Sequence, residues 1–407
     1  MSNQLKISQR AENTPPSPIR SLIGLANDAE RRGVHVHKLN IGQPDLHSPQ
    51  EFLDALHTFD HKTVAYDASP GNTTLLKQWT ELLNRHYTLG LTQHNMVITS
   101  GSSEALTFVF SICCDVGDDI LVFDPTYANY TGFASLAGVN LVPVECSFDS
   151  KFHLPQHSVV ESKITQHTRA ILVCNPNNPT GTTLTHDELH MLLQICEAHN
   201  LFLIVDEVYR EFVYGNRKPT SALELSEKNP RVIVVDSISK RYSLCGARIG
   251  CIISHNTDVM KAANTLASTR VSAPTVEQVA TAHMLETLDD TYLQRAVRVY
   301  ARRNQTLVTA LNSVPGVEVS KAEGGFYVLA KLPVENAENF AKFLLRDFSL
   351  NDETVFLAPA SGFYTTPSAI GRSSVRIAFV LKCADIQRAV EIIRRGLEVY
   401  TALQPAL

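Results

Sequence analysis

Six short apolar segments alternate with stretches of helical periodicity, and this alternation limits the possible folds more than any other feature. Each segment is rich in β-branched residues, which is typical of a strand buried on both faces. Because helices separate them, the sequence predicts an α/β fold with a mainly parallel, helix-covered sheet. The segments are NMVITS (95–100), DDILVFD (118–124), AILVCN (170–175), LFLIVDE (201–207), RVIVVDS (231–237) and RIGCIIS (248–254).

The pattern changes near Thr291, where long charged helical stretches surround the runs GGFYVLA (324–330) and SSVRIAFV (373–380). This change predicts a smaller α+β unit that the start of the chain joins. The 407 residues exceed the size of one typical core, which also indicates two domains. We predict an N-terminal arm over 1–18, a large domain over 48–290, and a small domain formed by 19–47 and 291–407.

The composition argues against several classes of partner. A formal net charge of −5 without a long basic run gives no reason to expect nucleic acid or an anionic membrane. The eight cysteines form no C-x-x-C pair, which favours reduced thiols and no metal site. The start lacks a signal-type apolar segment, and the best apolar stretch, ALTFVFSICC (105–114), is too short for a membrane span. We therefore expect a soluble, cytoplasmic protein that acts on small molecules.

The segment SISKRYSLCGARIG (237–250) places Lys240 just beyond a predicted strand, with Arg248 close behind it. Strand ends are where α/β sheets bind ligands. A lysine at a buried, cation-rich place can lose its proton and attack carbonyl carbons. An ordinary loop lysine in solvent is the alternative, so this hypothesis depends on the rest of the chain.

Two other predicted strands are followed by polar residues suited to an anion or an amide contact. Ser102 and Ser103 open a helix in SGSSEAL (100–106), and a helix N-terminus can bind phosphate. Asn178 lies in the rigid loop CNPNNPTG (174–181) and can offer an amide donor to a ligand. A serine-capped helix start and ordinary Asn-Pro turn chemistry are the alternatives.

Asp206 and Tyr209, in LFLIVDEVYREF (201–212), complete the set of groups at strand ends. A carboxylate at the end of an apolar strand is costly unless a cation or a donor meets it, and a heterocyclic N–H⁺ would serve. A helix N-cap and a packed tyrosine are the alternative. Together, the serines, Asn178, Asp206, Tyr209, Lys240 and Arg248 supply the kinds of groups that a pyridoxal-phosphate site needs, so we expect such a site here.

These motifs, with VRIAFV (375–380), resemble those of the class I/II aminotransferases among the fold type I pyridoxal-phosphate enzymes, most of all the bacterial aspartate aminotransferases. The resemblance runs from about Pro18 to the C-terminus, and NPNNPTG, DEVYREF and SISKRYSLCGARIG are its most specific pieces. It implies a large, mainly parallel seven-stranded sheet domain and a smaller α+β domain.

The resemblance also implies roles toward the cofactor. Lys240 would form an imine with it and act as general acid/base, and Asp206 would keep the pyridine nitrogen protonated. Tyr209 and Asn178 would bond the phenolic oxygen, and Tyr127, in DPTYANY (124–130), would stack on the ring. The phosphate would be held by Ser102, Ser103, Ser237, Arg248 and, across a two-fold interface, by Tyr66 of the neighbouring chain.

The resemblance implies that Arg376 grips the substrate α-carboxylate in a bidentate fork, helped by Asn178 and the backbone of Gly42. A surface arginine is the alternative for Arg376, although an unpaired guanidinium amid the apolar residues of VRIAF would be expensive. The implied enzyme is a homodimer with shared sites. It would pass the amino group of an L-amino acid to a 2-oxo acid, such as 2-oxoglutarate, by a ping-pong mechanism.

Nothing in the motifs fixes the substrate side chain. Aspartate is favoured, and Arg20 and Arg270 are the two candidates for its distal carboxylate, each of which an ordinary surface or interface arginine would also explain. Aromatic, alanine or methionine transamination is the alternative, followed by a C–S lyase or decarboxylase on the same scaffold. A ligand-sensing domain without turnover is a remote alternative, because only about 20 residues precede the region of resemblance, too few for a DNA-binding unit.

Overall fold

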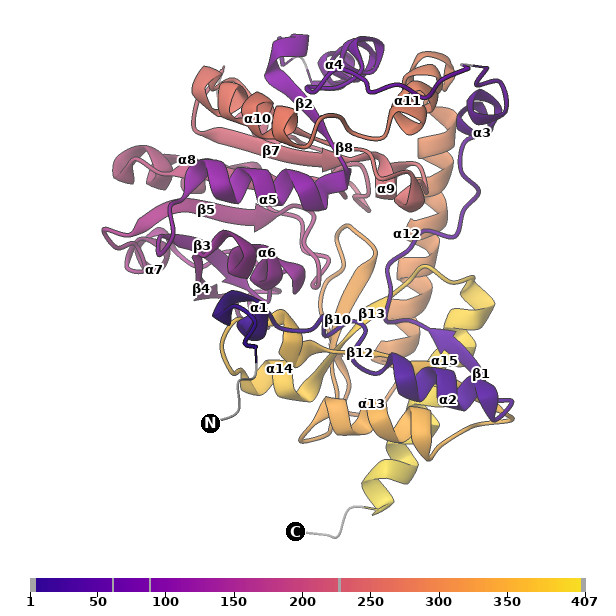
Figure 1. The fold of residues 1–407 in the computed structure, drawn as a ribbon. Coiled ribbons are helices and arrows are strands. Elements are labelled where there is room, and N and C mark those ends of the chain that lie inside the picture. Colours follow the sequence, from indigo (N-terminus) through magenta and orange to yellow (C-terminus); the bar gives the residue numbers. More distant parts are fainter. Residues whose placement is uncertain (1–4, 61, 88, 226–227, 404–407) are drawn as a thin grey trace.

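The structure is a computed structural model that describes residues 5–60, 62–87, 89–225 and 228–403 (Figure 1). Its larger sheet has seven strands in the order β2-β8-β7-β6-β5-β3-β4. β8 runs antiparallel to β2 and β7, and the other neighbours are parallel, so the mainly parallel sheet is confirmed. The strands are β2 (Met96–Thr99), β3 (Asp119–Asp124), β4 (Asn140–Glu145), β5 (Thr168–Cys174), β6 (Phe202–Asp206), β7 (Val232–Ser237) and β8 (Gly250–Ser254).

Six of these strands are the six apolar segments predicted from the sequence, and β4 is the one that the apolar pattern missed. β4 lies at the edge of the sheet, contains Pro143 and is only partly buried. An edge strand with a proline lacks the continuous apolar run by which a central strand is detected.

Helices cover both faces of the larger sheet because its strands bury side chains in both directions. In β6, Ile204 packs into one core with α5, α6 and α10, whereas Leu203 and Val205 pack into another with α4, α8 and α11. The helices of this region are α3 (Gln50–His57), α4 (Thr73–Tyr87), α5 (Gly101–Cys113), α6 (Asn129–Ala137), α7 (His157–Glu161), α8 (His186–His199), α9 (Ile238–Arg241), α10 (Thr257–Thr269) and α11 (Thr275–Thr287).

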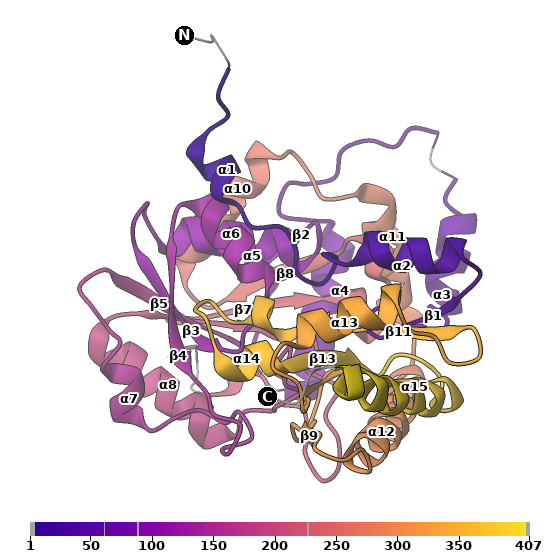
Figure 2. The same cartoon turned by 90° about the horizontal axis from the view of Figure 1, so that it is seen from below.

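The second part of the fold contains a four-stranded antiparallel sheet, β12-β13-β10-β9, and a parallel pair, β1 with β11. Figure 2 shows α12, α13 and α15 beside these strands. The elements are α2 (Ile23–Arg31), β1 (His35–Lys38), α12 (Thr291–Asn312), β9 (Glu318–Val319), β10 (Tyr327–Lys331), α13 (Ala337–Arg346), β11 (Glu353–Phe356), β12 (Ala358–Pro359), α14 (Ala369–Ser373), β13 (Ser374–Ala378) and α15 (Cys383–Leu403).

The β1–β11 pair brings the start of the chain against its end, in agreement with a small domain drawn from both; the domain boundaries themselves stay a prediction. In both views α1 (Gln9–Asn13) lies beside α6, and Arg10 donates from Nη1 to the Leu136 carbonyl at 3.3 Å (Figures 1 and 2). Four short 3-10 turns complete the fold: Gln93–Asn95, Ala222–Glu224, Cys245–Ala247 and Ala360–Phe363. Within the described ranges, no helix is long and apolar enough to cross a membrane.

Candidate active site

The candidate residues meet at one edge of the larger sheet because β5, β6 and β7 are parallel and end side by side. Cys174, the last residue of β5, is in register with Asp206, the last residue of β6. β7 ends at Ser237 and leads directly into α9, which carries Lys240. The carboxyl ends of parallel strands are where α/β sheets bind ligands, so this edge is the candidate active site.

Asp206 is a buried carboxylate, 3% exposed, that accepts hydrogen bonds only from neutral groups. The Tyr130 hydroxyl donates to its Oδ2 at 2.9 Å, and the Val208 amide donates to its Oδ1 at 3.3 Å. Burial raises the pKa of Asp206 from 3.8 to about 6, and these two bonds offset part of that rise. In the described part of the chain no basic side chain forms an ion pair with it, so a cationic ligand group would relieve its cost.

Tyr130 is a site residue that the sequence analysis missed. It is fully buried at the start of α6, and its ring lies edge-on to that of Tyr127, 5.3 Å between centroids. The Tyr127 hydroxyl accepts a hydrogen bond from Asn129 at 2.8 Å. The motif DPTYANY contains both tyrosines, but its pattern does not say which of them reaches the carboxylate of a different strand.

Lys240 lies partly buried with its amine toward the second part of the fold. Its Nζ donates to the Gly42 carbonyl at 3.1 Å and contacts Cys245 Sγ at 3.6 Å. Ser237 caps α9 through the Ser239 amide at 3.1 Å, and its hydroxyl also donates to the Ile249 carbonyl at 2.8 Å. Lys240 and Gly42, which are 198 residues apart, are thus brought together as expected for one site.

The start of α5 forms a cradle with Arg248. Gly101 has a φ of +75°, and a Cβ built on it would overlap the Arg248 guanidinium, which shows how closely that group approaches the helix N-terminus. Gly250 also lies close to the start of α5, since a Cβ built on it would be 2.7 Å from the Ser102 amide nitrogen. The first amides of a helix have no intrahelical acceptor, so Ser102, Ser103 and Arg248 present donors suited to a phosphate.

Arg376, on β13, is a buried guanidinium without a carboxylate partner. It is 1% exposed and lies between the rings of Tyr327 and Phe363, at 4.3 and 4.6 Å from their centroids. Its Nη1 donates to Asn178 Oδ1 at 2.9 Å, and its Nη2 donates to the Asn40 carbonyl. Its Nε is buried and has no hydrogen-bond partner within the described residues. Burial lowers the pKa of Arg376, because desolvation disfavours the charge.

Tyr327 is a second residue that the sequence analysis missed. Its hydroxyl shares a hydrogen bond of 2.9 Å with that of Tyr209, and a Cβ on Gly42 would overlap it. Tyr327 therefore connects the phenol expected to contact the cofactor with the arginine expected to hold the substrate. The run GGFYVLA contains it, but an apolar strand pattern does not distinguish a core tyrosine from a functional one.

The remaining candidate residues, Arg270, Arg20 and Tyr66, differ in their exposure and in their contacts. Arg270 is already engaged, because its Nε pairs with Glu104 at 3.1 Å and its Nη2 donates to the Ile98 carbonyl at 2.6 Å. Arg20 is exposed, and its side chain has no hydrogen bond or ion pair among residues that the structure describes. Tyr66 is 81% exposed on its own chain. In the described ranges, no three His, Cys, Asp or Glu side chains gather where they could hold a metal ion.

The fold and this site define the class of protein. The structure matches an aspartate aminotransferase from Thermus thermophilus with maleate, with a TM-score of 0.87 and 25% identity over 97% of this chain and 100% of that one. It also matches an alanine aminotransferase from Pyrococcus furiosus, with a TM-score of 0.89 and 28% identity over the same shares. The chain has the fold of the fold type I aminotransferases.

The sequence model described as "Aminotransferase class I and II" matches residues 34–393. The chain belongs to this family of transaminases, which use pyridoxal phosphate. An aspartate aminotransferase of Bacillus subtilis is 26% identical over 98% of this chain and 100% of its own length. One of Thermotoga maritima is 29% identical over 96% of this chain and 98% of its own.

Proposed function

We propose that this chain is a pyridoxal-phosphate-dependent transaminase that passes the amino group of an L-amino acid to a 2-oxo acid, with aspartate as the favoured donor. The observation that carries the proposal is the state of Arg376, which is 1% exposed and has a buried Nε without a partner in the described part of the chain. A buried, incompletely paired guanidinium is expensive unless a ligand carboxylate joins it.

The residues present fit the cofactor. Asp206 would accept the pyridinium N–H, and Tyr209 would donate to the phenolic oxygen. Asn178 Oδ1 accepts a hydrogen bond from Arg376, and Asn178 Nδ2 has no partner among the described residues, so this Nδ2 would donate to the same phenolic oxygen. The α5 N-terminus, with Arg248, would hold the phosphate. When bound, the cofactor supplies an electron sink for the electrons released at the substrate α-carbon.

The protein side chains then have separate tasks. The amine of Lys240 would attach the cofactor and, once free, carry the proton taken from the substrate; its contact with the Gly42 carbonyl supports a resting place for that amine. Arg376 would fix the substrate carboxylate, and Asp206 would hold a proton on the ring nitrogen. Tyr209 and Tyr327 would keep water out between these two charges.

Lys240 offers the direct test of the proposed function. Borohydride reduction of the holoenzyme should fix the cofactor to a peptide that contains Lys240. Lys240→Ala should retain phosphate binding but lose nearly all turnover, because the attaching amine is gone. Lys261→Ala, which removes an exposed lysine on α10, provides the control. Recovery of the cofactor on a peptide without Lys240 would reject the assignment.

Arg20 is better supported than Arg270 as the arginine that would bind the distal carboxylate of aspartate. The Ile19 carbonyl accepts from Asn40 at 3.0 Å, and the Asn40 carbonyl in turn accepts from Arg376, so Arg20 adjoins a segment that touches the substrate arginine. Arg270 would first have to leave Glu104. Arg20→Ala should reduce kcat/KM for aspartate about tenfold or more and change that for alanine little. Arg295→Ala, another exposed arginine, is the control, and equal losses for both donors would reject Arg20.

We also propose a homodimer with shared sites, which the exposure of Tyr66, 81%, supports. A Lys240→Ala chain and a Tyr66→Asp chain should each be nearly inactive. In a hybrid dimer one site would combine an intact Lys240 with an intact Tyr66, so activity should return without any wild-type chain. Hybrids that demonstrably exchange subunits but stay inactive would exclude the shared site.

A further inference from the structure

A cavity of about 570 Å³ lies away from the candidate active site, between the ends of α4 and α11, the start of α12 and the segment that follows β6. Its volume is that of a small-molecule site. None of the candidate residues for cofactor or substrate lines it. One wall is apolar and includes Leu82, Leu285, Leu288, Leu293 and Val297.

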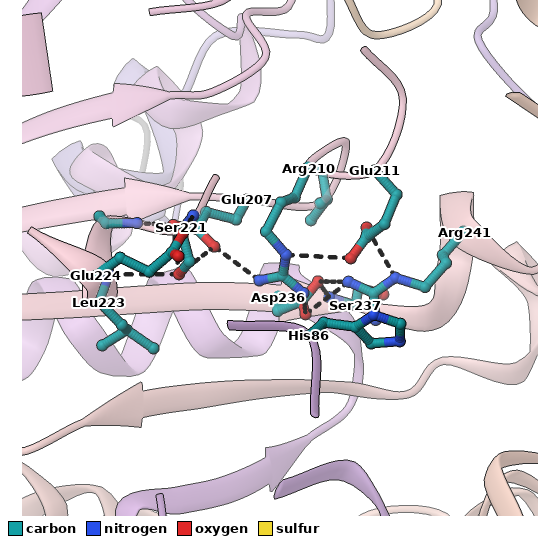
Figure 3. A network of polar contacts seen from close by, with 12 residues as sticks. His86, Glu207, Arg210, Glu211, Ser221, Leu223, Glu224, Asp236, Ser237 and Arg241 are labelled. Carbon is teal, nitrogen blue, oxygen red and sulfur yellow. Dashed lines mark hydrogen bonds and ion pairs between the residues drawn. The ribbon is translucent and has the colours of Figure 1, made fainter. Parts of the chain in front are cut away.

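Glu211 and Arg241 also line the cavity, and both belong to a buried network of charges (Figure 3). Asp236 accepts from Arg210 at 2.8 Å and from Arg241 at 2.9 Å. Glu211 lies between the same two arginines, 3.1 Å from Arg210 and 2.8 Å from Arg241, and Glu207 pairs with Arg210 at 2.7 Å. Arg210 thus uses all three of its nitrogens on carboxylates, which leaves Arg241 as the arginine with unused capacity.

Three donors that line the cavity lack an acceptor. Arg241 lines the cavity with only 2% of its side chain exposed, and its Nη1 has no hydrogen-bond partner in the described residues. Tyr87 and Tyr242 also line it, and their hydroxyls form no hydrogen bond within residues that the structure describes. Burial, followed by the nearby Glu211, raises the pKa of Tyr87, so its phenol stays a proton donor at neutral pH. Of these, Arg241 Nη1 is a buried donor without an acceptor, which is uncommon and calls for a ligand or water.

We propose that this cavity is a second binding site, for a small organic monocarboxylate with an apolar body. The carboxylate would accept from Arg241, Tyr87 and Tyr242, and the apolar body would lie against the leucine wall. Asp289 and Asp290 also line the cavity, as do Arg217 and Arg298, so charges of both signs surround the apolar wall. Arg241 directly follows Lys240 in α9, so the site lies at the back of the element that carries the proposed catalytic lysine.

The test uses phenylacetate as the probe and the holoenzyme of the Arg376→Ala variant, in which the substrate carboxylate site is disabled. Calorimetry should find one phenylacetate site per chain. Leu293→Trp in the same background should weaken it about tenfold or more by filling the cavity from a partly exposed position on α12. Tyr87→Phe should weaken it by a factor of about three to ten, because one donor is lost. Neutral phenylacetamide should bind about tenfold more weakly than phenylacetate.

Leu136→Trp is the matched control, since it makes the same change on α6, outside the cavity, and should leave phenylacetate affinity within about twofold. Arg376→Met, which also removes the positive charge, replaces the alanine background if that variant fails to fold by circular dichroism. No binding of phenylacetate up to about 10 mM, or binding that Leu293→Trp and Leu136→Trp affect equally, would overturn the proposal. Equal affinity for phenylacetamide would also overturn it, because the charge would then contribute nothing.

Discussion

Asp206→Asn provides a quantitative test of the electrostatics of the site. Burial raises the pKa of Asp206 from 3.8 to about 6, so the folded chain without cofactor binds this proton more tightly than the unfolded chain does. Stability is therefore greatest below the unfolded pKa and falls as the pH rises through the folded pKa. A shift of about 2 units corresponds to a total loss of about 3 kcal/mol, of which about 2 kcal/mol falls between pH 4 and pH 7. The neutral asparagine should not show this loss.

Urea unfolding of protein stripped of cofactor, followed from pH 4.5 to 7.5, measures the effect. The unfolding free energy of Asp206→Asn relative to wild type should rise by about 2 kcal/mol across this range. The asparagine amide faces the Val208 N–H and shifts the variant by a constant amount, so the slope matters and not the offset. Asp124, whose pKa burial also raises to about 6, is present in both proteins and cancels in the difference.

A second measurement checks that the buried charge serves the cofactor. Pyridoxal phosphate should raise the unfolding midpoint of the wild type more than that of Asp206→Asn, because only the carboxylate gains an ionic partner. Parallel pH curves for the two cofactor-free proteins would refute the reasoning about burial. Diverging curves with equal cofactor stabilisation would refute only the pairing of Asp206 with the pyridine nitrogen.

Two further predictions concern the phosphate cradle and an ion cluster far from it. Gly101→Ala should weaken the affinity for pyridoxal phosphate at least tenfold, because the new Cβ meets Arg248 at a positive φ; Gly132→Ala, where a Cβ meets nothing within 4 Å, should not. His153, hydrogen-bonded to two glutamates, has its pKa raised from 6.5 to about 9, so its stabilisation is complete below pH 6.5 and is lost as the pH rises through about 9. His153→Gln should flatten that loss in urea unfolding, which we place at about 1 kcal/mol after solvent screening. Unchanged cofactor affinity in Gly101→Ala, or an unchanged pH profile in His153→Gln, would contradict these accounts.

Much of the fold follows from the sequence because the central strands are buried on both faces. Valine and isoleucine runs such as those of β6 and β7 are difficult to place elsewhere, and all six predicted strands are present. Strand direction is a different matter, since an apolar run is the same in either orientation. The antiparallel course of β8 depends on the short connection through α9 and Cys245–Ala247, which returns the chain to the neighbouring position.

The site could be predicted where one residue type is costly in its local context. A carboxylate at a strand end, such as Asp206, or a guanidinium in an apolar strand, such as Arg376, is noticeable because burial penalises it. Tyr130 and Tyr327 were missed for the opposite reason, because tyrosine is common in protein cores and its burial is not costly. Their hydroxyls contact Asp206 and Tyr209, which lie on other elements, and no local pattern encodes those contacts.

The tyrosines lie beside the two buried charged groups of the site, Asp206 and Arg376. Asp206 and Arg376 carry opposite charges, yet they do not pair; phenols and amides lie around each of them instead. A direct ion pair would satisfy both groups and leave nothing for a ligand. Held apart, each retains an unmet electrostatic demand: Asp206 for a cation, as the raised pKa shows, and Arg376 for an anion, as the lowered pKa shows. Under the proposed function, a ligand system with a protonated ring nitrogen at one end and a carboxylate at the other would meet both demands at once, and the stability that the folded chain gives up would favour that charge pattern.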